Sequence, residues 1–299
     1  MGNTILTPQI IAREALMVLR NNAVLANLVH RDYSDEFVAG VGDTITIRKP
    51  ATFEAKEFNG SITVQDATES GVSVKMDKHL DVSFAVTSKE MTLDIADFSE
   101  QLLVPAMQAF ADKVDKYIIG LESDITQRVT FDGTDAITDA VIDARKYLTD
   151  AAAPLTNRRF VYGSTIESDL LKTDLFMSAE RVGDEGTALR EASLGRKYGL
   201  DLYVDQNIAE KTTGEGESEV TYTPNLIFHK NAFALVTRPL ELPLGASQSA
   251  IVSYDGLGLR VVYGYNQSTK TDTISIDMLC GVKTLDKNLA AVISDERTA

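Results

Sequence analysis

The residues best able to do chemistry in this 299-residue chain are few and lie far apart. The three histidines, His30, His79 and His229, have no second histidine or cysteine at the spacing of a metal site. We therefore expect each of them to be structural. The one cysteine, Cys280, falls in an alternating strand pattern, where a small buried apolar side chain is expected. A single thiol also excludes an intramolecular disulfide framework.

Patterns for nucleophiles and phosphate loops are present only in part. Ser164 follows Gly163 but lacks the second glycine of a nucleophile turn, and residues 164–167 (STIE) have the form of a helix capping box. The segment 256–258 (GLG) lacks the third glycine of a phosphate loop, and 214–217 (GEGE) places carboxylates where an anion would bind. Both segments are predicted to be turns. The sequence therefore predicts no catalytic residue, no cofactor site and no metal site.

The charge balance is strongly acidic, with 44 acidic and 29 basic residues and a formal net charge of −15. Proteins that grip the phosphates of nucleic acids usually carry a basic patch instead. Two interpretations stay open: an acidic surface that keeps the protein soluble, or the wall of a container that must not adhere to polyanionic contents. No run approaches the roughly 20 apolar residues of a membrane span. The first residues do not form a signal peptide, so we expect the protein to stay where it is made.

The N-terminal third predicts a helix followed by paired strands. Thr7 is a candidate N-cap, Pro8 suits the first helical position, and apolar residues recur at helical spacing until an exit near residues 30–33. Residues 42–91 alternate with a period of two, and Asn59-Gly60 predicts a tight hairpin turn. Because the middle of this hairpin is polar and an isolated hairpin is marginal in water, we expect it to lie on a neighbouring subunit. The expected contacts are Phe53, Phe58 and Ile62.

Residues 97–125 form the longest helical pattern, with an apolar residue on nearly every turn from Leu103 to Ile125. Pro105 predicts either a kink or a later true start. The acidic residues Asp112, Asp115 and Glu122 are expected on a markedly negative solvent face. Charge reversal at these three positions should then be tolerated and should strengthen retention of DNA.

The second half of the chain mixes both element types before it returns to strands. The predicted helices cover residues 137–148 and 164–171, and the predicted strands between and after them cover 159–162, 200–204 and 227–236. Three further runs, 250–254, 259–265 and 273–280, predict an antiparallel meander.

The order of these elements resembles the α+β fold of tailed-phage major capsid proteins, the Hong Kong ninety-seven-type fold. Three stretches, 7–16 (TPQIIAREAL), 31–33 (RDY) and 42–50 (GDTITIRKP), resemble the opening of coat proteins from short-tailed enterobacterial phages. The resemblance implies the following parts: an N-terminal arm (1–41), an E-loop hairpin with peripheral strands (42–92), a spine helix (93–129), an axial domain (130–245) and C-terminal strands returning to the peripheral domain (246–299).

The same resemblance implies a structural protein that assembles with itself into pentamers and hexamers of an icosahedral shell around double-stranded DNA, without specific DNA binding or a membrane. The implied partners are a separate scaffolding protein, a portal and a decoration protein. The implied locations are the virion and, during assembly, the host cytoplasm. Hinges are expected near Gly42 and Gly133. Two alternatives stay open: an encapsulin-like shell around a cargo enzyme, and an enzyme of unknown type, which a pocket of clustered titratable residues would favour.

Overall fold

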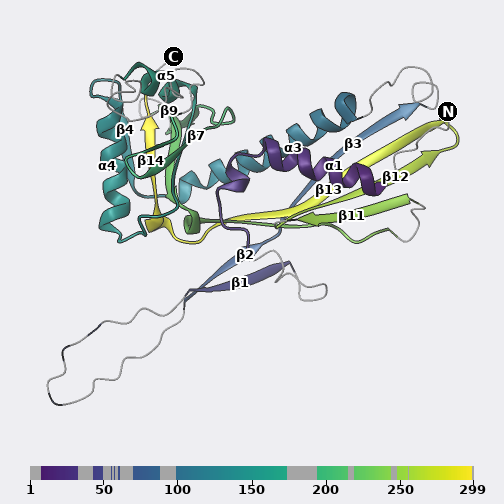
Figure 1. The fold of residues 1–299 in the computed structure, drawn as a ribbon, viewed down its shortest axis with the longest axis horizontal. Helices are drawn as coiled ribbons and strands as arrows, with labels where there is room; N and C mark the ends of the chain where they lie inside the picture. The colour runs from purple at the N-terminus through teal and green to yellow at the C-terminus, as the bar shows by residue number, and fades with distance from the viewer. Residues whose placement is uncertain are drawn as a thin grey trace.

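A computed structural model of the chain describes residues 8–32, 43–49, 55, 57, 60, 70–87, 99–173, 194–214, 219–243, 248–254 and 256–297. These residues form two β-sheets with helices packed on them, and a two-stranded ribbon projects from the body (Figure 1). The N-terminal end of the described chain lies at the far end of the longer sheet, whereas the C-terminal end lies at the other sheet (Figure 1). No helix within the described ranges is long and apolar enough to cross a membrane.

The first sheet has five strands within the described residues, and all of its pairings are antiparallel. Its strands are β3 (Lys78–Thr87), β10 (Phe233–Arg238), β11 (Gln248–Tyr254), β12 (Leu257–Asn266) and β13 (Thr271–Thr284). The pairings of β11 with β12 and of β12 with β13 confirm the predicted C-terminal meander. The alternation of side chains leaves one apolar face, and helices α1 and α3 cover that face (Figure 1).

Helix α1 (Pro8–Asn22) begins where the sequence predicts, because proline fits the first turn of a helix. It ends earlier than the predicted exit at residues 30–33, and the chain continues through the 3-10 helix η1 (Leu25–Asn27). The carboxylate of Asp115 accepts hydrogen bonds from the backbone N–H groups of Val24 and Ala26. These tertiary bonds satisfy donors that a continuing helix would have paired internally, which accounts for the early end.

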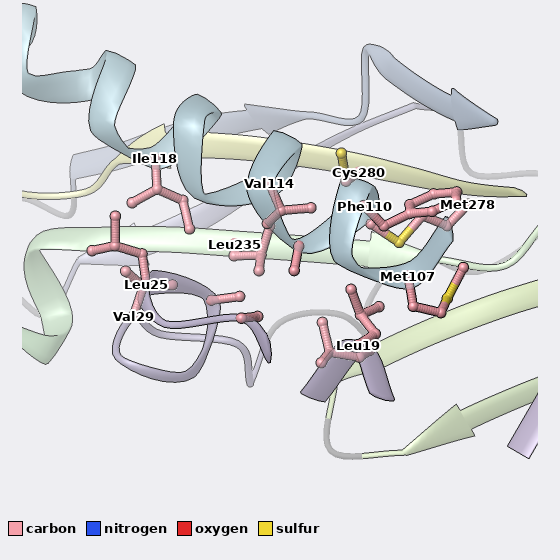
Figure 2. Packing of buried hydrophobic residues seen from close by; sticks show 14 of the residues in the cluster. Leu19, Leu25, Val29, Met107, Phe110, Val114, Ile118, Leu235, Met278 and Cys280 are labelled. Carbon is pink, nitrogen blue, oxygen red and sulfur yellow. The ribbon is translucent and has the colours of Figure 1, made fainter. Parts of the chain in front are cut away.

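Helix α3 (Val104–Gly120) starts later than residue 97, because Pro105 occupies its first turn. A π-helical segment, η3 (Ser99–Leu103), precedes it, and the 3-10 helix η4 (Leu121–Asp124) follows it. The predicted apolar stripe is confirmed over most of its length. Side chains from α3 pack against α1, η1, β10 and β13 in one continuous core (Figure 2). The labelled members on α3 are Met107, Phe110, Val114 and Ile118, and all are at most 1% exposed.

The second sheet is mixed, with β5–β7 and β4–β14 parallel and its other pairings antiparallel. Its strands are β4 (Arg128–Phe131), β5 (Arg158–Tyr162), β6 (Arg196–Lys197), β7 (Leu200–Val204), β8 (Lys211–Thr213), β9 (Val220–His229) and β14 (Ala290–Asp295). Helices α4 (Ile137–Asp150) and α5 (Ser164–Lys172) confirm the two helices that the sequence predicts, and both pack on this sheet. The capping-box prediction is wrong, because Gly163 is the N-cap of α5 and no side chain caps it.

Two short crossovers join the sheets. The 3-10 helix η6 (Lys230–Ala232) connects β9 to β10, and η7 (Lys287–Leu289) lies between β13 and β14. The two crossovers lie together, since the carbonyl of Ala232 accepts from the N–H of Leu285 at 2.8 Å. Residues 246–299 are therefore divided between the two sheets. After β13 the chain crosses from the first sheet to the second, where β14 lies between β4 and β9. The largest buried cluster consequently includes residues from both sheets.

Candidate functional site

The residues that the sequence singled out for chemistry do not gather in one place. His229 accepts from the N–H of Asn231, His30 lies 3.3 Å from Asp32, and His79 lies 3.9 Å from a carboxylate of β13. Within the described ranges, no three His, Cys, Asp or Glu side chains are arranged to hold a metal ion. Cys280 is fully buried on β13, and burial raises the pKa of its thiol to about 12, which disfavours the nucleophilic thiolate.

Of the two glycine-containing segments, 256–258 lies at a tight strand connection, whereas residues 215–217 of the other lie outside the described residues. Gly256 has a φ of +72° in the tight connection between β11 and β12, where Tyr254 pairs with Leu257. The N–H of Gly258, which a phosphate loop would direct at an anion, donates to the hydroxyl of Thr237. Gly214 has a φ of +95° and directly follows β8.

The feature that stands out from the body is the ribbon of β1 (Thr44–Lys49) and β2 (Ser70–Lys75) (Figure 1). The two strands are antiparallel, with Ile45 opposite Val74 and Lys49 opposite Ser70. Alternation puts threonine and serine on one exposed face and apolar side chains on the other. The sequence predicts these strands correctly because the period of two is strong in both.

The base of the ribbon is fixed to the first sheet. Ile47, Val74 and Met76 are buried with Val236 of β10 in a small cluster of their own. The backbone of the ribbon passes so close to β13 that a Cβ added at Gly281 would overlap the carbonyl oxygen of Lys75. This close approach requires glycine. The ribbon therefore leaves the body at a defined place.

Neither outer edge of the ribbon pairs with another strand in the part of the chain that the structure describes. An unpaired edge carries free N–H and C=O groups and is a natural place for contact with another chain. The predicted contact residues Phe53, Phe58 and Ile62 lie outside the described residues, as does the proposed hinge Gly42.

The predicted negative face of the 97–125 helix is wrong for the residues with described burial, 101–124. Asp115 and Glu122 are 1% and 2% exposed, so neither belongs to a solvent face. Asp112 and Asp124 are exposed, but Lys113 and Lys116 are exposed on the same stretch and balance them. Charge reversal at Asp115 or Glu122 would place an unpaired cation in the interior, which costs several kcal/mol rather than being tolerated.

The two buried acids connect parts of the chain that are distant in sequence. Glu122 lies within hydrogen-bonding distance of Arg128, Lys211 and Tyr222, at 2.5, 3.1 and 3.0 Å. Burial opposes its ionisation, but the bonds from Lys211 and Arg128 outweigh burial and hold its pKa below the usual value. Asp115 binds the turn that follows α1. Sequence reasoning missed both, because an acid beside an apolar helical stripe has no local sign of a partner so far along the chain.

The chain was compared with protein-family models, curated proteins and solved structures, and only solved structures match it. No family model matches the chain, and no curated protein matches it. Among solved structures, a chain from Mycobacterium phage Che8 matches with a TM-score of 0.65 and 20% identity, covering 91% of this chain and 90% of that one. A chain of the capsid of cyanophage P-SCSP1u matches with a TM-score of 0.58 and 12% identity, covering 86% and 84%.

A chain of a virus-like particle from Pyrococcus furiosus also matches, with a TM-score of 0.54 and 12% identity, covering 95% of this chain and 97% of that one. In each case the likeness extends over both sheets, because it covers most of the length of both chains. Sequence identities of 12–20% support a shared fold and nothing more specific. The chain therefore has the α+β phage capsid fold that its sequence predicts.

Proposed function

We propose that this chain is the major capsid protein of a tailed bacteriophage and assembles with copies of itself into the icosahedral shell that encloses the phage DNA. The observation that carries the proposal is the likeness of fold over nearly the full length of phage chains. Because a shared fold does not by itself imply a shared function, the projecting ribbon is the second support. We propose no catalytic role for any residue.

The proposed assignment of residue ranges to the parts of the capsid fold follows the sequence resemblance. Residues 1–41 would be the N-terminal arm, 42–92 the E-loop with peripheral strands, 93–129 the spine helix and 130–245 the axial domain. Residues 246–289 would return to the peripheral sheet, and β14, which pairs with β4 and β9, would belong to the axial domain. Each subunit would lay its E-loop across a neighbour, with Phe53, Phe58 and Ile62 in the contact, and axial domains would meet around pentamers and hexamers.

One chain can occupy both kinds of position only if some segment absorbs small changes of angle. Gly133 lies between β4 and α4 with a φ of +83°, a conformation that glycine adopts readily. Its α-carbon also sits against Arg297, since an added Cβ would lie 2.7 Å from Cδ of that side chain. We propose Gly133 as one hinge of the subunit.

The proposed partners are copies of the chain, a separate scaffolding protein, a portal and a decoration protein. The net charge of −15 supports a shell that encloses double-stranded DNA without binding it specifically. We propose the virion as the final location and the host cytoplasm as the site of assembly. A closer relation to the coat proteins of short-tailed enterobacterial phages stays a prediction that rests on residues 7–16, 31–33 and 42–50.

Sedimentation of the purified chain, alone and with the proposed scaffolding protein, tests the proposal. We expect capsomers or large closed particles at assembly concentrations. A chain that stays a monodisperse monomer under all these conditions would overturn the proposal.

The alternative is an encapsulin-like shell that encloses a cargo enzyme. The likeness to a chain of a virus-like particle from Pyrococcus furiosus, over 95% of this chain, keeps it in consideration. Particles isolated from the native host distinguish the two. A phage shell should contain double-stranded DNA and no stoichiometric second enzyme, whereas a compartment should contain a protein cargo and no genome-length DNA.

A further inference from the structure

Two buried carboxylates lie where three separate parts of the chain meet. Asp115 on α3 is 1% exposed and accepts from the N–H groups of Val24 and Ala26 at 2.9 and 3.0 Å. Asp205, which directly follows β7, is 2% exposed, and its Oδ1 accepts from the N–H of Asn207 at 2.8 Å. Its Oδ2 is buried and has no hydrogen-bond partner among the described residues. A buried ionised oxygen without a partner is costly.

The two carboxylates are held near each other by a contact between their elements. Nδ2 of Asn207 donates to Oδ1 of Asp112 at 3.2 Å, which fixes the turn 205–207 against α3. Asp115 lies about one helical turn further along α3, and the negative charge of Asp205 acts on it. The site therefore brings together the turn after α1, the middle of α3 and the end of a strand in the second sheet.

The other charged groups that act on the pair are Asp112 and Lys116, both on α3. Segment 23–29, which packs against Asp115, contains no ionisable side chain. Burial raises the pKa of Asp115 to about 7, although the bonds from Val24 and Ala26 oppose this and the charge of Asp205 adds to it. Burial also raises the pKa of Asp205, and the charge of Asp112 contributes.

We propose that Asp115 and Asp205 form a proton-operated latch, which holds the turns 24–26 and 205–207 on helix α3 when the pair carries a proton and loosens them when it does not. With one proton bound, the pair carries a single negative charge. Loss of that proton leaves two neighbouring buried charges with too few donors, and opening of the turns to water relieves this cost. The inference does not depend on the proposed function, because it concerns the folded subunit.

The sign of the effect follows from the direction of the shift. A carboxyl whose pKa is higher in the folded state than its ordinary 3.8 stabilises the closed form most at low pH. That stabilisation is lost as the pH rises towards and through about 7. For one such group, the equilibrium constant for opening should rise about tenfold between about pH 6 and about pH 8.

Hydrogen exchange of the full-length chain, read by mass spectrometry at these two pH values and corrected for intrinsic exchange, tests the latch. We expect peptides that cover 23–29 and 205–209 to open about tenfold more at the higher pH. Asp205→Asn keeps the acceptor for Asn207 and removes the charge, so it should lower the pH midpoint of opening and reduce this difference, while the burial of Asp115 keeps part of it. Asp143→Asn, at an exposed position on α4, should leave the difference unchanged.

Asp112→Asn provides a second test of the latch by hydrogen exchange if Asp205→Asn perturbs folding. It keeps a carbonyl oxygen for Asn207 but removes the charge beside Asp205, so the pH midpoint of opening should fall. Equal opening at both pH values in the unmodified chain would overturn the latch. So would a pH response that stays the same in both the Asp205→Asn and Asp112→Asn chains.

Discussion

The phenol of Tyr222 donates a hydrogen bond to Oε1 of Glu122 at 3.0 Å, across 100 positions of sequence. Glu122 lies in η4, which follows α3 directly, and Tyr222 lies on β9 of the second sheet. Arg128 at the start of β4 and Lys211 of β8 complete the set of donors to the same carboxylate. One buried acid thus ties the segment that follows α3 to three strands of the second sheet.

Replacement of Glu122 by glutamine should destabilise the chain markedly, because it leaves Arg128 and Lys211 facing a neutral partner. We expect a loss of roughly 2–3 kcal/mol in the free energy of unfolding, measured by urea denaturation. The loss should stay below that of a fully buried pair, since the Arg128 and Lys211 side chains are 33% and 34% exposed. The control is Glu210→Gln at a neighbouring exposed position, which should change stability by less than about 0.5 kcal/mol. Equal effects of the two substitutions would contradict this role of Glu122.

The same carboxylate should make the chain sensitive to acid. Because the pKa of Glu122 is held below its ordinary 4.5, its ionised form stabilises the fold above that pH. The stabilisation is lost as the pH falls below about 4.5 and the group becomes protonated. The unmodified chain should therefore lose more unfolding free energy than Glu122→Gln when the pH is lowered into this range. Parallel losses in the two chains would show that other carboxylates dominate acid unfolding.

Substitution of Gly281 tests directly whether the close contact between β13 and Lys75 holds the base of the ribbon on the first sheet. Gly281→Ala would drive a methyl group into the backbone of Lys75, so we expect a loss of roughly 1–3 kcal/mol and faster proteolysis of residues 44–75. Gly264→Ala is the matched control, because an added Cβ at that strand position meets no atom within 4 Å. That change should be neutral or slightly stabilising. If Gly281→Ala changes neither the free energy of unfolding nor the rate of proteolysis, the contact of the ribbon with β13 does not hold the ribbon in place.

Local patterns in the sequence predict most elements of this fold. The period of two within residues 42–91, the strand pattern of 273–280, and the helical stripe that contains Met107 and Phe110 depend only on neighbours along the chain. The later start of α3 follows from Pro105 alone. Elements of this kind can be inferred because their signal repeats within a few residues.

The errors concern properties set by partners far along the chain. Asp115 and Glu122 looked exposed because acids on a helix usually are, and their donors come from Val24 and Tyr222. Strand β14 was grouped with the preceding meander, although its pairing with β4 and β9 decides its sheet. Register across distant strands has no signature in a single sequence. The candidate contact residues Phe53, Phe58 and Ile62 stay a prediction.

Removal of residues 50–69, which join β1 to β2, should separate folding from assembly. Lys49 pairs with Ser70, so residues 50–69 can be replaced by an Asn-Gly turn without breaking the register of β1 and β2. We expect circular dichroism and thermal unfolding close to those of the full chain, but no large particles in sedimentation. The control replaces 214–219 by the same turn between the paired residues Thr213 and Val220. An unfolded truncated chain would show that the segment belongs to the core of the subunit.

Electron microscopy of the purified full-length chain, after assembly with its scaffolding protein, tests the central claim most directly. The proposal predicts closed icosahedral particles of uniform diameter, in which one subunit's ribbon of β1 and β2 lies across the neighbouring subunit. Single dispersed subunits, or open aggregates without symmetry, at concentrations where the folded chain is intact would contradict the assignment of this chain as a capsid protein.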